Sequence, residues 1–274
     1  MIVTRRYQQV LRYSLIVLVL IAWAFPTIWL ITGSFKPQQS IIEGDFFGVF
    51  TPTMENYATV FQTQNYAQYL FNSLVVSVLT TAVSLIVGIL AAYSVSRFQT
   101  GGKLYSSWVV FMRMTPPAIL IIPFYIMFKN LNLINTVWAL ILANVTFNIP
   151  FVIWTMKGFF ETLPLEMEEA AMIDGCTRVQ SIFLIAIPVV RSGILTTGIF
   201  CYLFTWNEYL FGLTLGLSEQ SKVLPVAIGN FITGYAVNWG PLFAAGTLVM
   251  LPALIVVIFL QNYIVDGLMV GSIK

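Results

Sequence analysis

Long runs without charge dominate this chain and restrict what it can fold into. The run from Leu15 to Phe35 contains no charged side chain, and a helix needs about 20 apolar residues to cross a bilayer. Similar runs predict six membrane-spanning helices, at about residues 15–35, 70–96, 106–128, 136–156, 189–212 and 241–262. Only 9% of residues are charged, against about 25% in soluble domains. We expect an all-α integral membrane protein, one transmembrane domain over residues 1–274, with external loops at 36–69 and 213–240.

The first run has features of a secretory signal. It follows Arg5, Arg6 and Arg12 and contains Ala22-Trp23-Ala24, a pattern of small residues typical of cleavage sites. The apolar run continues to Phe35, which is longer than the apolar region of a signal peptide. We therefore interpret it as an uncleaved anchor.

Several classes of activity are excluded by missing residue types. The chain has no histidine, which removes Ser-His and Cys-His catalysis and histidine metal sites. Its two cysteines, Cys176 and Cys201, are far apart and have no metal-ligand neighbours in the sequence. No phosphate-binding loop of the form G-x-x-x-x-G-K-[ST] occurs, and a net charge of +2 gives no sign of nucleic-acid binding. We expect no catalytic residues, no metal and no cofactor in this chain.

The segment from Glu161 to Pro188 is different from the apolar runs on either side of it. Five of the eleven acidic residues lie between Glu161 and Asp174. Pro164 suits the start of a helix, and Gly175 suits a left-handed stop. Thr177 and Gln180 have the spacing of a capping box for a second helix, whose apolar positions Val179, Ile182, Phe183 and Ala186 would share one side. The sequence therefore predicts helix, tight glycine turn, helix.

The same segment carries a family motif. Glu169-Ala170-Ala171, then Gly175, then Ile185-Ala186-Ile187-Pro188 resembles the EAA loop of ABC importer permeases. That resemblance implies the type I ABC importer permease fold, with the loop at 161–188 acting as a cytoplasmic coupling helix that docks on a separate ATPase. The coupling residues that it implies are Glu168, Glu169, Ala170, Ala171, Asp174, Gly175, Ile185 and Pro188. The alternative, a hairpin lying on the membrane surface, should be basic, whereas this segment is acidic.

Three further matches point to one group within that family. Trp206-Asn207-Glu208-Tyr209-Leu210 is similar to the W-N-E-[FY]-L segment of carbohydrate permeases. The outer loop with Asn230, Phe231 and Tyr235 is placed like the loop that reaches the binding protein in the maltose-type group, although an ordinary surface loop fits equally. The tail with Gly267, Gly271 and Lys274 resembles the group's ATPase-contacting ending, but Met269 and Ile273 replace its usual Thr and Val. The closest resemblance is to the second permease subunit of these importers.

Polar side chains inside the predicted spans are candidates for the pathway. Ser73, Ser77, Thr80, Ser84 and Gly88 have a helical spacing that favours close helix packing. Asn144 and Asn148 fit interhelical hydrogen bonding and pathway lining about equally. Arg113 is the basic residue well inside a span, a default functional candidate, but we favour a side chain that extends to the interface. Trp206, Asn207 and Glu208 complete the pathway candidates; Glu208 fits interfacial water or a gating contact.

The distribution of positive charge predicts the orientation. Nine Lys and Arg residues lie in the termini and loops on one side (Arg5, Arg6, Arg12, Arg97, Lys103, Lys157, Arg178, Arg191 and Lys274). The other side has three, Lys36, Lys129 and Lys222. Because cytoplasmic loops are enriched in Lys and Arg, both termini and the acidic segment should be cytoplasmic, in the inner membrane of a bacterium or archaeon.

The resemblance also implies partners and a mechanism. It implies a second, homologous permease, two ATP-binding subunits that carry ATP and Mg²⁺, and an extracytoplasmic solute-binding protein. The ATPase pair would drive alternating access through spans three to six, moving a carbohydrate or polyol. An ion-coupled secondary transporter is the main alternative, but the two halves show no internal repeat and no midplane ion site. An intramembrane enzyme would need catalytic residues that the chain lacks.

Overall fold

The computed structural model describes residues 2–44, 50–63, 65–233 and 237–270, with the backbone alone for residues 2–6, 63 and 262–270. Within these ranges the regular structure is helical, and the single β-type contact is an isolated bridge between Ile232 and Val237. The chain divides into two compact units. One consists of Met1–Tyr66 with Ile228–Leu251, and the other of Ala67–Ala227 with Pro252–Lys274.

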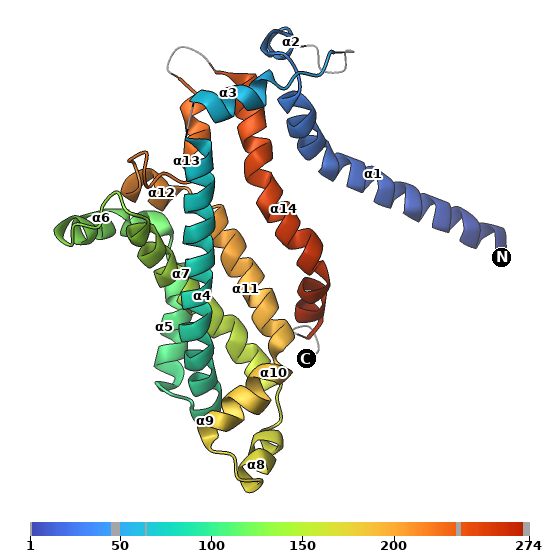
Figure 1. Cartoon of the computed structure of the whole chain (residues 1–274). Helices are drawn as coiled ribbons and strands as arrows, with labels where there is room; N and C mark the ends of the chain where they lie inside the picture. The colour runs from blue at the N-terminus through green and yellow to red at the C-terminus, as the bar shows by residue number, and fades with distance from the viewer. Residues whose placement is uncertain (1, 45–49, 64, 234–236, 271–274) are drawn as a thin grey trace. The chain divides into compact units, whose positions relative to one another are not determined.

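The smaller unit begins with one long apolar helix. It contains α1 (Ile2–Ser34), α2 (Gln38–Ile42), α3 (Glu55–Thr63), η3 (Ile228–Phe231) and the first part of α14 (Trp239–Val270) (Figure 1). The α1 helix continues through Pro26 without a break in the assigned helix. The predicted loop at 36–69 therefore contains two short helices and the first turn of α4.

Side-chain amides hold the smaller unit together. Asn56 is buried and donates hydrogen bonds to the carbonyls of Ser34 and Lys36, at 2.9 and 2.8 Å. Gln38 donates to the Val237 carbonyl at 3.3 Å and accepts from the Gly240 amide at 2.9 Å. Buried amides that bond to backbone groups in this way satisfy carbonyls that the ends of the helices leave unpaired.

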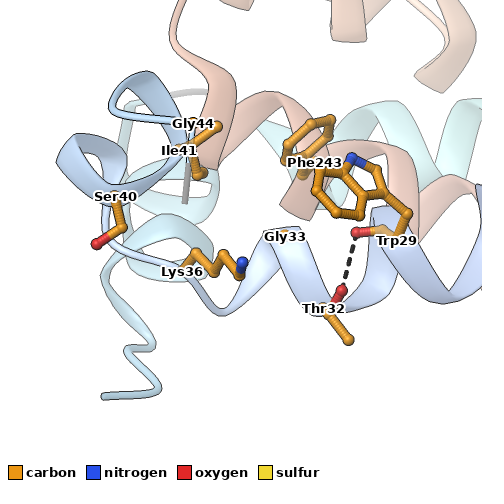
Figure 2. Close-up of a pocket in the computed structure, with 8 residues that line it drawn as sticks. All are labelled: Trp29, Thr32, Gly33, Lys36, Ser40, Ile41, Gly44 and Phe243. Atoms are coloured by element: carbon orange, nitrogen blue, oxygen red, sulfur yellow. Dashed lines mark hydrogen bonds between the residues drawn. The ribbon is translucent and has the colours of Figure 1, made fainter. Parts of the chain in front are cut away.

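A small cavity lies beside the end of α1. Figure 2 shows Lys36 among its lining residues, together with Trp29, Ser40 and Phe243. The Lys36 ammonium is 5.6 Å from the centre of the Trp29 ring and 4.9 Å from that of Phe50, which are cation–π distances. Gly33 is required here, because a Cβ atom would lie 2.6 Å from the Phe243 ring.

The larger unit contains the remaining helices (Figure 1). In chain order they are α4 (Tyr66–Phe98), α5 (Gly102–Met114), η1 (Pro117–Leu120), α6 (Ile121–Asn130), α7 (Val137–Glu161), α8 (Leu165–Ile173), α9 (Arg178–Ser181), the π-helical η2 (Ile182–Ala186), α10 (Ile187–Val189), α11 (Arg191–Trp206), α12 (Leu210–Leu215) and α13 (Leu224–Ala227). The second half of α14 also belongs to this unit.

Four of the described helices are long and apolar enough to cross a membrane, and six spans result when each bent helix pair counts as one. The first bent pair is α5 with η1 and α6, which turn by 93°. Its bend lies at Thr115-Pro116-Pro117, between the end of α5 and the start of η1, because proline removes a backbone donor and ends a helix. The second pair turns by 76° at Val190, between Arg178–Val189 and Arg191–Trp206.

The small residues of α4 lie at a helix contact, as predicted. Ser73, Ser77, Thr80 and Ser84 are all buried. Gly88 continues this side, and a Cβ atom there would lie 2.5 Å from Cγ1 of Val152 on α7. The absence of a side chain at Gly88 therefore allows α4 and α7 to pack closely.

Two apolar clusters form the core of the larger unit. One joins the C-terminal half of α4 to α7 and to the segment 186–201, and includes Tyr93, Val152, Met156, Phe160 and Ala186. The other joins α6, α7, α12 and α13 around Phe128, Leu140, Phe211 and Val226. The first cluster reaches the end of the unit where α8 and α9 lie, beyond the C-terminal ends of α4 and α7 (Figure 1).

Candidate functional site

The acidic segment folds as the helix–turn–helix that the sequence predicted. We call Leu165–Ser181, which comprises α8, the Gly175 turn and α9, the elbow. Gly175 has a φ of +96°, the left-handed region that favours glycine. Its amide bonds to the Met172 carbonyl at 3.2 Å, and the Cys176 amide bonds to the Ala171 carbonyl at 3.0 Å. This pair of hydrogen bonds is a Schellman motif, which fixes the end of α8.

The second helix begins with the predicted capping box. The Thr177 side chain accepts from the Gln180 amide, and the Gln180 side chain accepts from the Thr177 amide at 2.8 Å. Both ends of the turn are thus hydrogen-bonded. Pro164 occupies the N-cap position of α8 and not the first helical position that we expected for it, because the helix begins at Leu165.

The elbow has one exposed acidic and apolar face. Glu166, Glu169 and Asp174 are exposed on it. Ile173 is 86% exposed, an unusual position for a large apolar side chain. Ala170 is also exposed, whereas Ala171 is buried. A small residue between carboxylates leaves the α8 backbone accessible to a close-fitting surface.

The opposite side of α8 is bound to α4 by an ion pair. Glu168 is 4% exposed, and its Oε1 lies 2.7 Å from both Nε and Nη2 of Arg97. Tyr93 donates its hydroxyl to Oε2 of the same carboxylate. Arg97 Nη2 also donates to the Leu163 carbonyl at 2.9 Å, in the turn before α8. Glu168 therefore faces the spans, whereas its neighbour Glu169 faces outward.

Aromatic contacts extend this attachment. The Tyr93 ring meets Phe160 of α7 edge-on, with centroids 5.5 Å apart and planes at 87°. The Arg178 guanidinium of α9 lies over the Phe98 ring at 5.1 Å. The end of α4 thus contacts α7, α8 and α9. Neither Tyr93 nor Arg97 was among the coupling residues expected from the sequence. Their contacts with Glu168 join positions 75 and 71 residues apart, and a single sequence carries no signal for such contacts.

The segment after α9 departs from a regular helix. Ile182–Ala186 is π-helical, which shifts the later side chains around the axis. The expected common apolar side is therefore divided: Ala186 is buried, whereas Val179 and Phe183 are more than half exposed. Ile185 is partly buried, and Pro188 lies exposed in α10 just before the bend at Val190.

Three of the pathway candidates line one small cavity in the larger unit. Asn144, Trp206 and Glu208 border it, together with Ser73 and Thr205 among others. The Glu208 carboxylate accepts hydrogen bonds from the amides of Phe211 at 3.0 Å and Gly212 at 3.2 Å, and so caps the start of α12. Asn207 is exposed, outside the cavity lining, and bonds back to the Leu203 carbonyl.

The other two candidates make contacts between helices. Asn148 is buried and donates to Thr205 Oγ1 at 3.0 Å, which joins α7 to α11. The Arg113 guanidinium lies 4.8 Å from the centres of the Phe151 and Phe204 rings. It thus packs against aromatic side chains of α7 and α11. Arg113 is nevertheless exposed, so this cation–π contact lies at the surface of the unit.

The outer loop and tail candidates are only partly described. Asn230 is exposed and Phe231 is buried in η3 of the smaller unit, whereas Tyr235 lies outside the described residues. Gly267 falls within the backbone-only part of α14. Gly271 and Lys274 also lie outside the described residues.

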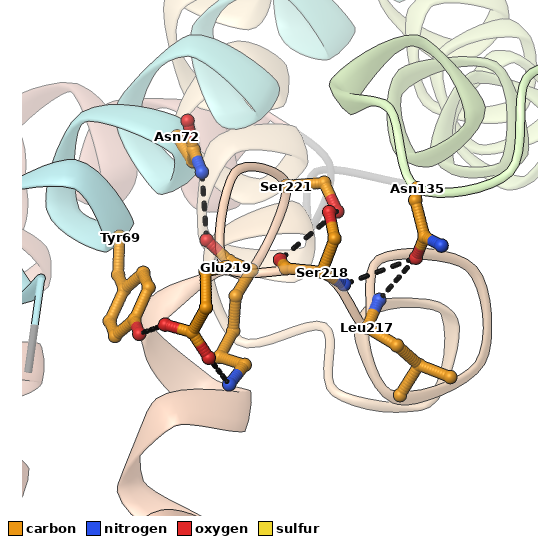
Figure 3. A network of polar contacts seen from close by, with 8 residues as sticks. Tyr69, Asn72, Asn135, Leu217, Ser218, Glu219 and Ser221 are labelled. Carbon is orange, nitrogen blue, oxygen red and sulfur yellow. Dashed lines mark hydrogen bonds and ion pairs between the residues drawn. The ribbon is translucent and has the colours of Figure 1, made fainter.

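A polar network that the sequence analysis missed holds the loop between α12 and α13. Figure 3 shows Tyr69 and Asn72 of α4 on one side of this loop and Asn135 on the other. Asn72 donates to the carbonyls of Gln220 and Lys222, both at 2.9 Å, and Asn135 accepts from the amides of Leu217 and Ser218.

The same network fixes the charge of Glu219. Its carboxylate pairs with Lys222 Nζ at 2.6 Å and accepts from the Tyr69 hydroxyl (Figure 3). The pKa of Glu219 is held below its ordinary value mainly by the hydrogen bond with Lys222 and secondly by that with Tyr69. Within the described residues, no group of three or more Cys, Asp or Glu side chains is arranged to hold a metal ion.

Comparison with known families identifies the chain. Residues 84–270 match the family described as binding-protein-dependent transport system inner membrane component. The chain belongs to this family. It is a permease of a binding-protein-dependent importer in the inner membrane, and the secondary-transporter alternative is not favoured.

Relatives of the permease match it along nearly its whole length. It is 31% identical to the sulfoquinovosyl glycerol transport system permease protein of Agrobacterium fabrum, over 96% of this chain and 93% of the relative. It is 30% identical to the diacetylchitobiose uptake system permease protein of Streptomyces coelicolor, with 94% of each chain covered. The trehalose transport system permease protein of Mycobacterium tuberculosis is 31% identical, with 91% and 92% covered.

Solved structures agree on the fold. A chain of a bacterial ABC transporter involved in the import of the acidic polysaccharide alginate superposes with a TM-score of 0.76, at 18% identity, covering 95% of the permease and 97% of that chain. The expected ABC importer permease fold is therefore confirmed.

Proposed function

We propose that this permease imports a carbohydrate or related polyol and is driven by an ATPase that docks on the exposed face of the elbow. One observation supports this most strongly. The elbow presents Glu169, Ile173 and Asp174 outward on a turn fixed by a Schellman motif and a capping box. A rigid, acidic and partly apolar projection suits docking to another protein. Glu169 and Asp174 supply the docking hydrogen bonds, and Gly175 the turn geometry.

The energy source lies in other subunits. The sequence has no phosphate-binding loop, so ATP and Mg²⁺ bind to two separate ATP-binding subunits. An extracytoplasmic solute-binding protein delivers the cargo. A second, homologous permease completes the translocation pathway, and the long exposed apolar surface of α1 is available to that subunit or to lipid. The nine-to-three excess of Lys and Arg supports cytoplasmic termini and a cytoplasmic elbow.

The cargo class follows from the relatives. Those named above carry a sulfonated sugar glycoside, an amino-sugar disaccharide and a disaccharide. Amide, hydroxyl and indole groups such as those of Asn144, Thr205 and Trp206 suit polyhydroxylated solutes, but the cavity that these three residues border has a volume of about 10 Å³ and is too small to hold a sugar in this state. Glu208, Asn148 and Arg113 stabilise the helices around this region.

Transport proceeds by alternating access. Closure of the ATPase pair on ATP moves the two docking clefts together and carries each elbow with them. The helices joined to the elbow then open the pathway toward the binding protein. ATP can shift this equilibrium only as far as it binds the closed ATPase more tightly than the open one.

The test is reconstitution with the neighbouring gene products. The permease, purified with them and incorporated into vesicles, should yield an ATP-hydrolysing subunit and accumulate the binding protein's sugar only when ATP is supplied. Uptake that persists without ATP but stops with an uncoupler would overturn the proposal. Labelling of an Asp174→Cys variant from the external side would also overturn it.

A further inference from the structure

We propose that Arg97, Glu168 and Tyr93 form a latch that makes α4 move with the elbow, so that the ATPase drives this span as well as those that follow it. The mechanism implied by the family resemblance involved only spans three to six, and α4 is the second span. This inference rests on the proposed function, because it assigns a path to the force that the elbow receives.

The latch is a buried ion pair with further hydrogen bonds on both of its members. The carboxylate of Glu168 uses both oxygens, one for Arg97 and one for Tyr93. Arg97 Nη2 also donates a hydrogen bond to the Leu163 carbonyl at 2.9 Å. The side chains of Arg97 and Glu168 are only 7% and 6% exposed. One guanidinium therefore connects α4 both to α8 and to the turn that precedes α8.

Stability does not explain such a pair well. Buried ion pairs cost desolvation free energy, and well-packed apolar replacements are often equally stable. What a charge-assisted contact through two guanidinium nitrogens adds is a fixed distance and direction between two elements. Here it joins a span to a surface helix, beside the contact of Arg178 of α9 with Phe98 of the same span.

The geometry transmits motion in a defined direction. Tyr93 and Arg97 are four residues apart, on one side of the last turn and a half of α4. Both reach the same carboxylate, so a displacement of α8 acts on α4 at two levels. Phe160 packs on Tyr93, which places the end of α7 against the same point. Arg97, Glu168 and Tyr93 are thus positioning residues: they touch no cargo and no nucleotide.

The test removes the charges and keeps the volume. The variant R97M/E168M is reconstituted with the ATPase and the binding protein, and cargo uptake and ATP hydrolysis are measured together. The matched control is K157M/E161M, which removes the 2.9 Å ion pair within α7 near the same end of the unit. We expect R97M/E168M to retain the ATPase and hydrolyse ATP, while uptake per ATP falls about tenfold, within the usual range of coupling between sites.

Two further variants separate latching from folding. The exchanged pair R97E/E168R should recover most of the lost uptake per ATP, because it restores the contact with reversed charges. Tyr93→Phe should lower the ratio by a smaller factor at an unchanged melting temperature. If R97M/E168M does not assemble, Arg97→Lys, which keeps the charge but not the fork of donors, should lower the ratio in the same way.

If R97M/E168M has the wild-type ratio of uptake to ATP hydrolysed, the proposal of a latch is overturned. The same holds for Arg97→Lys where that variant replaces the double variant. An equal loss in K157M/E161M also overturns it. These results are distinct from a failure of the proposed function, in which no ATPase would copurify with the wild-type permease and no uptake would depend on ATP.

Discussion

Glu168 and Glu169 are neighbours in the sequence but serve opposite sides of α8. Glu168 is buried against Arg97 at 2.7 Å, whereas Glu169 is exposed on the face that points away from the spans. The resemblance to the EAA loop grouped the two together as coupling residues. Their surroundings place Glu168 against α4 and leave Glu169 exposed, where the proposed docking of the ATPase would use it.

Substitution of these two residues should therefore have different effects. Glu169→Arg should lower cargo-stimulated ATP hydrolysis by more than about tenfold, because a reversed charge at a docking surface costs more than the about 1.4 kcal/mol of a tenfold change, and should leave the melting temperature of the permease unchanged. Glu168→Gln should instead destabilise the permease by about 3 kcal/mol, since it leaves a buried guanidinium without its counter-charge. Thermal unfolding and ATPase assays on both variants decide this; identical behaviour of the two would contradict the assignment.

The loop between α12 and α13 should depend on Asn72. Asn72→Ala removes two hydrogen bonds from a buried amide and leaves the carbonyls of Gln220 and Lys222 unpaired. We expect a loss of about 1–3 kcal/mol in local stability, visible as faster amide hydrogen exchange at residues 217–223. Asn207→Ala is the control, because Asn207 is exposed and bonds only within the end of its own helix. Unchanged exchange in Asn72→Ala would show that the loop is held by other contacts.

The same loop should respond to acid. The Lys222 ammonium and the Tyr69 hydroxyl lower the pKa of Glu219 in the folded state. Its stabilising contribution is therefore complete above the unfolded-state pKa of about 4.3, and it is lost as the pH falls through the lowered folded-state pKa. Because the Glu219 side chain is 60% exposed, the effect should be small. Amide hydrogen exchange of the loop is measured from about pH 6 to about pH 3, on either side of that pKa. The wild type should lose protection of the loop as the pH falls, and Glu219→Gln should show a flatter response.

Local features of the elbow could be predicted from the sequence, because they depend on neighbouring residues. Gly175, Thr177 and Gln180 have turn and capping preferences that act within a few residues, and each lies as expected. The buried serines of α4 were likewise indicated by their helical spacing.

Other features could not be predicted, because they depend on tertiary contacts. The pairing of Arg97 with Glu168 joins positions 71 residues apart. The acidic segment contains several other carboxylates that could equally have paired with Arg97. Pro116 and Pro117 lie at the bend of the third span, but proline alone does not determine an angle of 93°. The expectation that Arg113 extends toward the interface stays a prediction, whereas its contacts with Phe151 and Phe204 depend on how α7 and α11 pack.

The most direct measurement concerns the turn of the elbow. Gly175 has open space around it, so a side chain there would meet no neighbour; the obstacle is its φ of +96°. Gly175→Val should strain the backbone by about 1–3 kcal/mol and rotate α8 relative to α9, whereas Gly158→Ala, also in open space but in a regular helix, should be tolerated. Uptake and cargo-stimulated ATP hydrolysis are measured in the reconstituted complex. Loss of both in Gly175→Val, with normal membrane insertion and a normal Gly158→Ala control, is the predicted result; full coupling in Gly175→Val would contradict the role of the elbow.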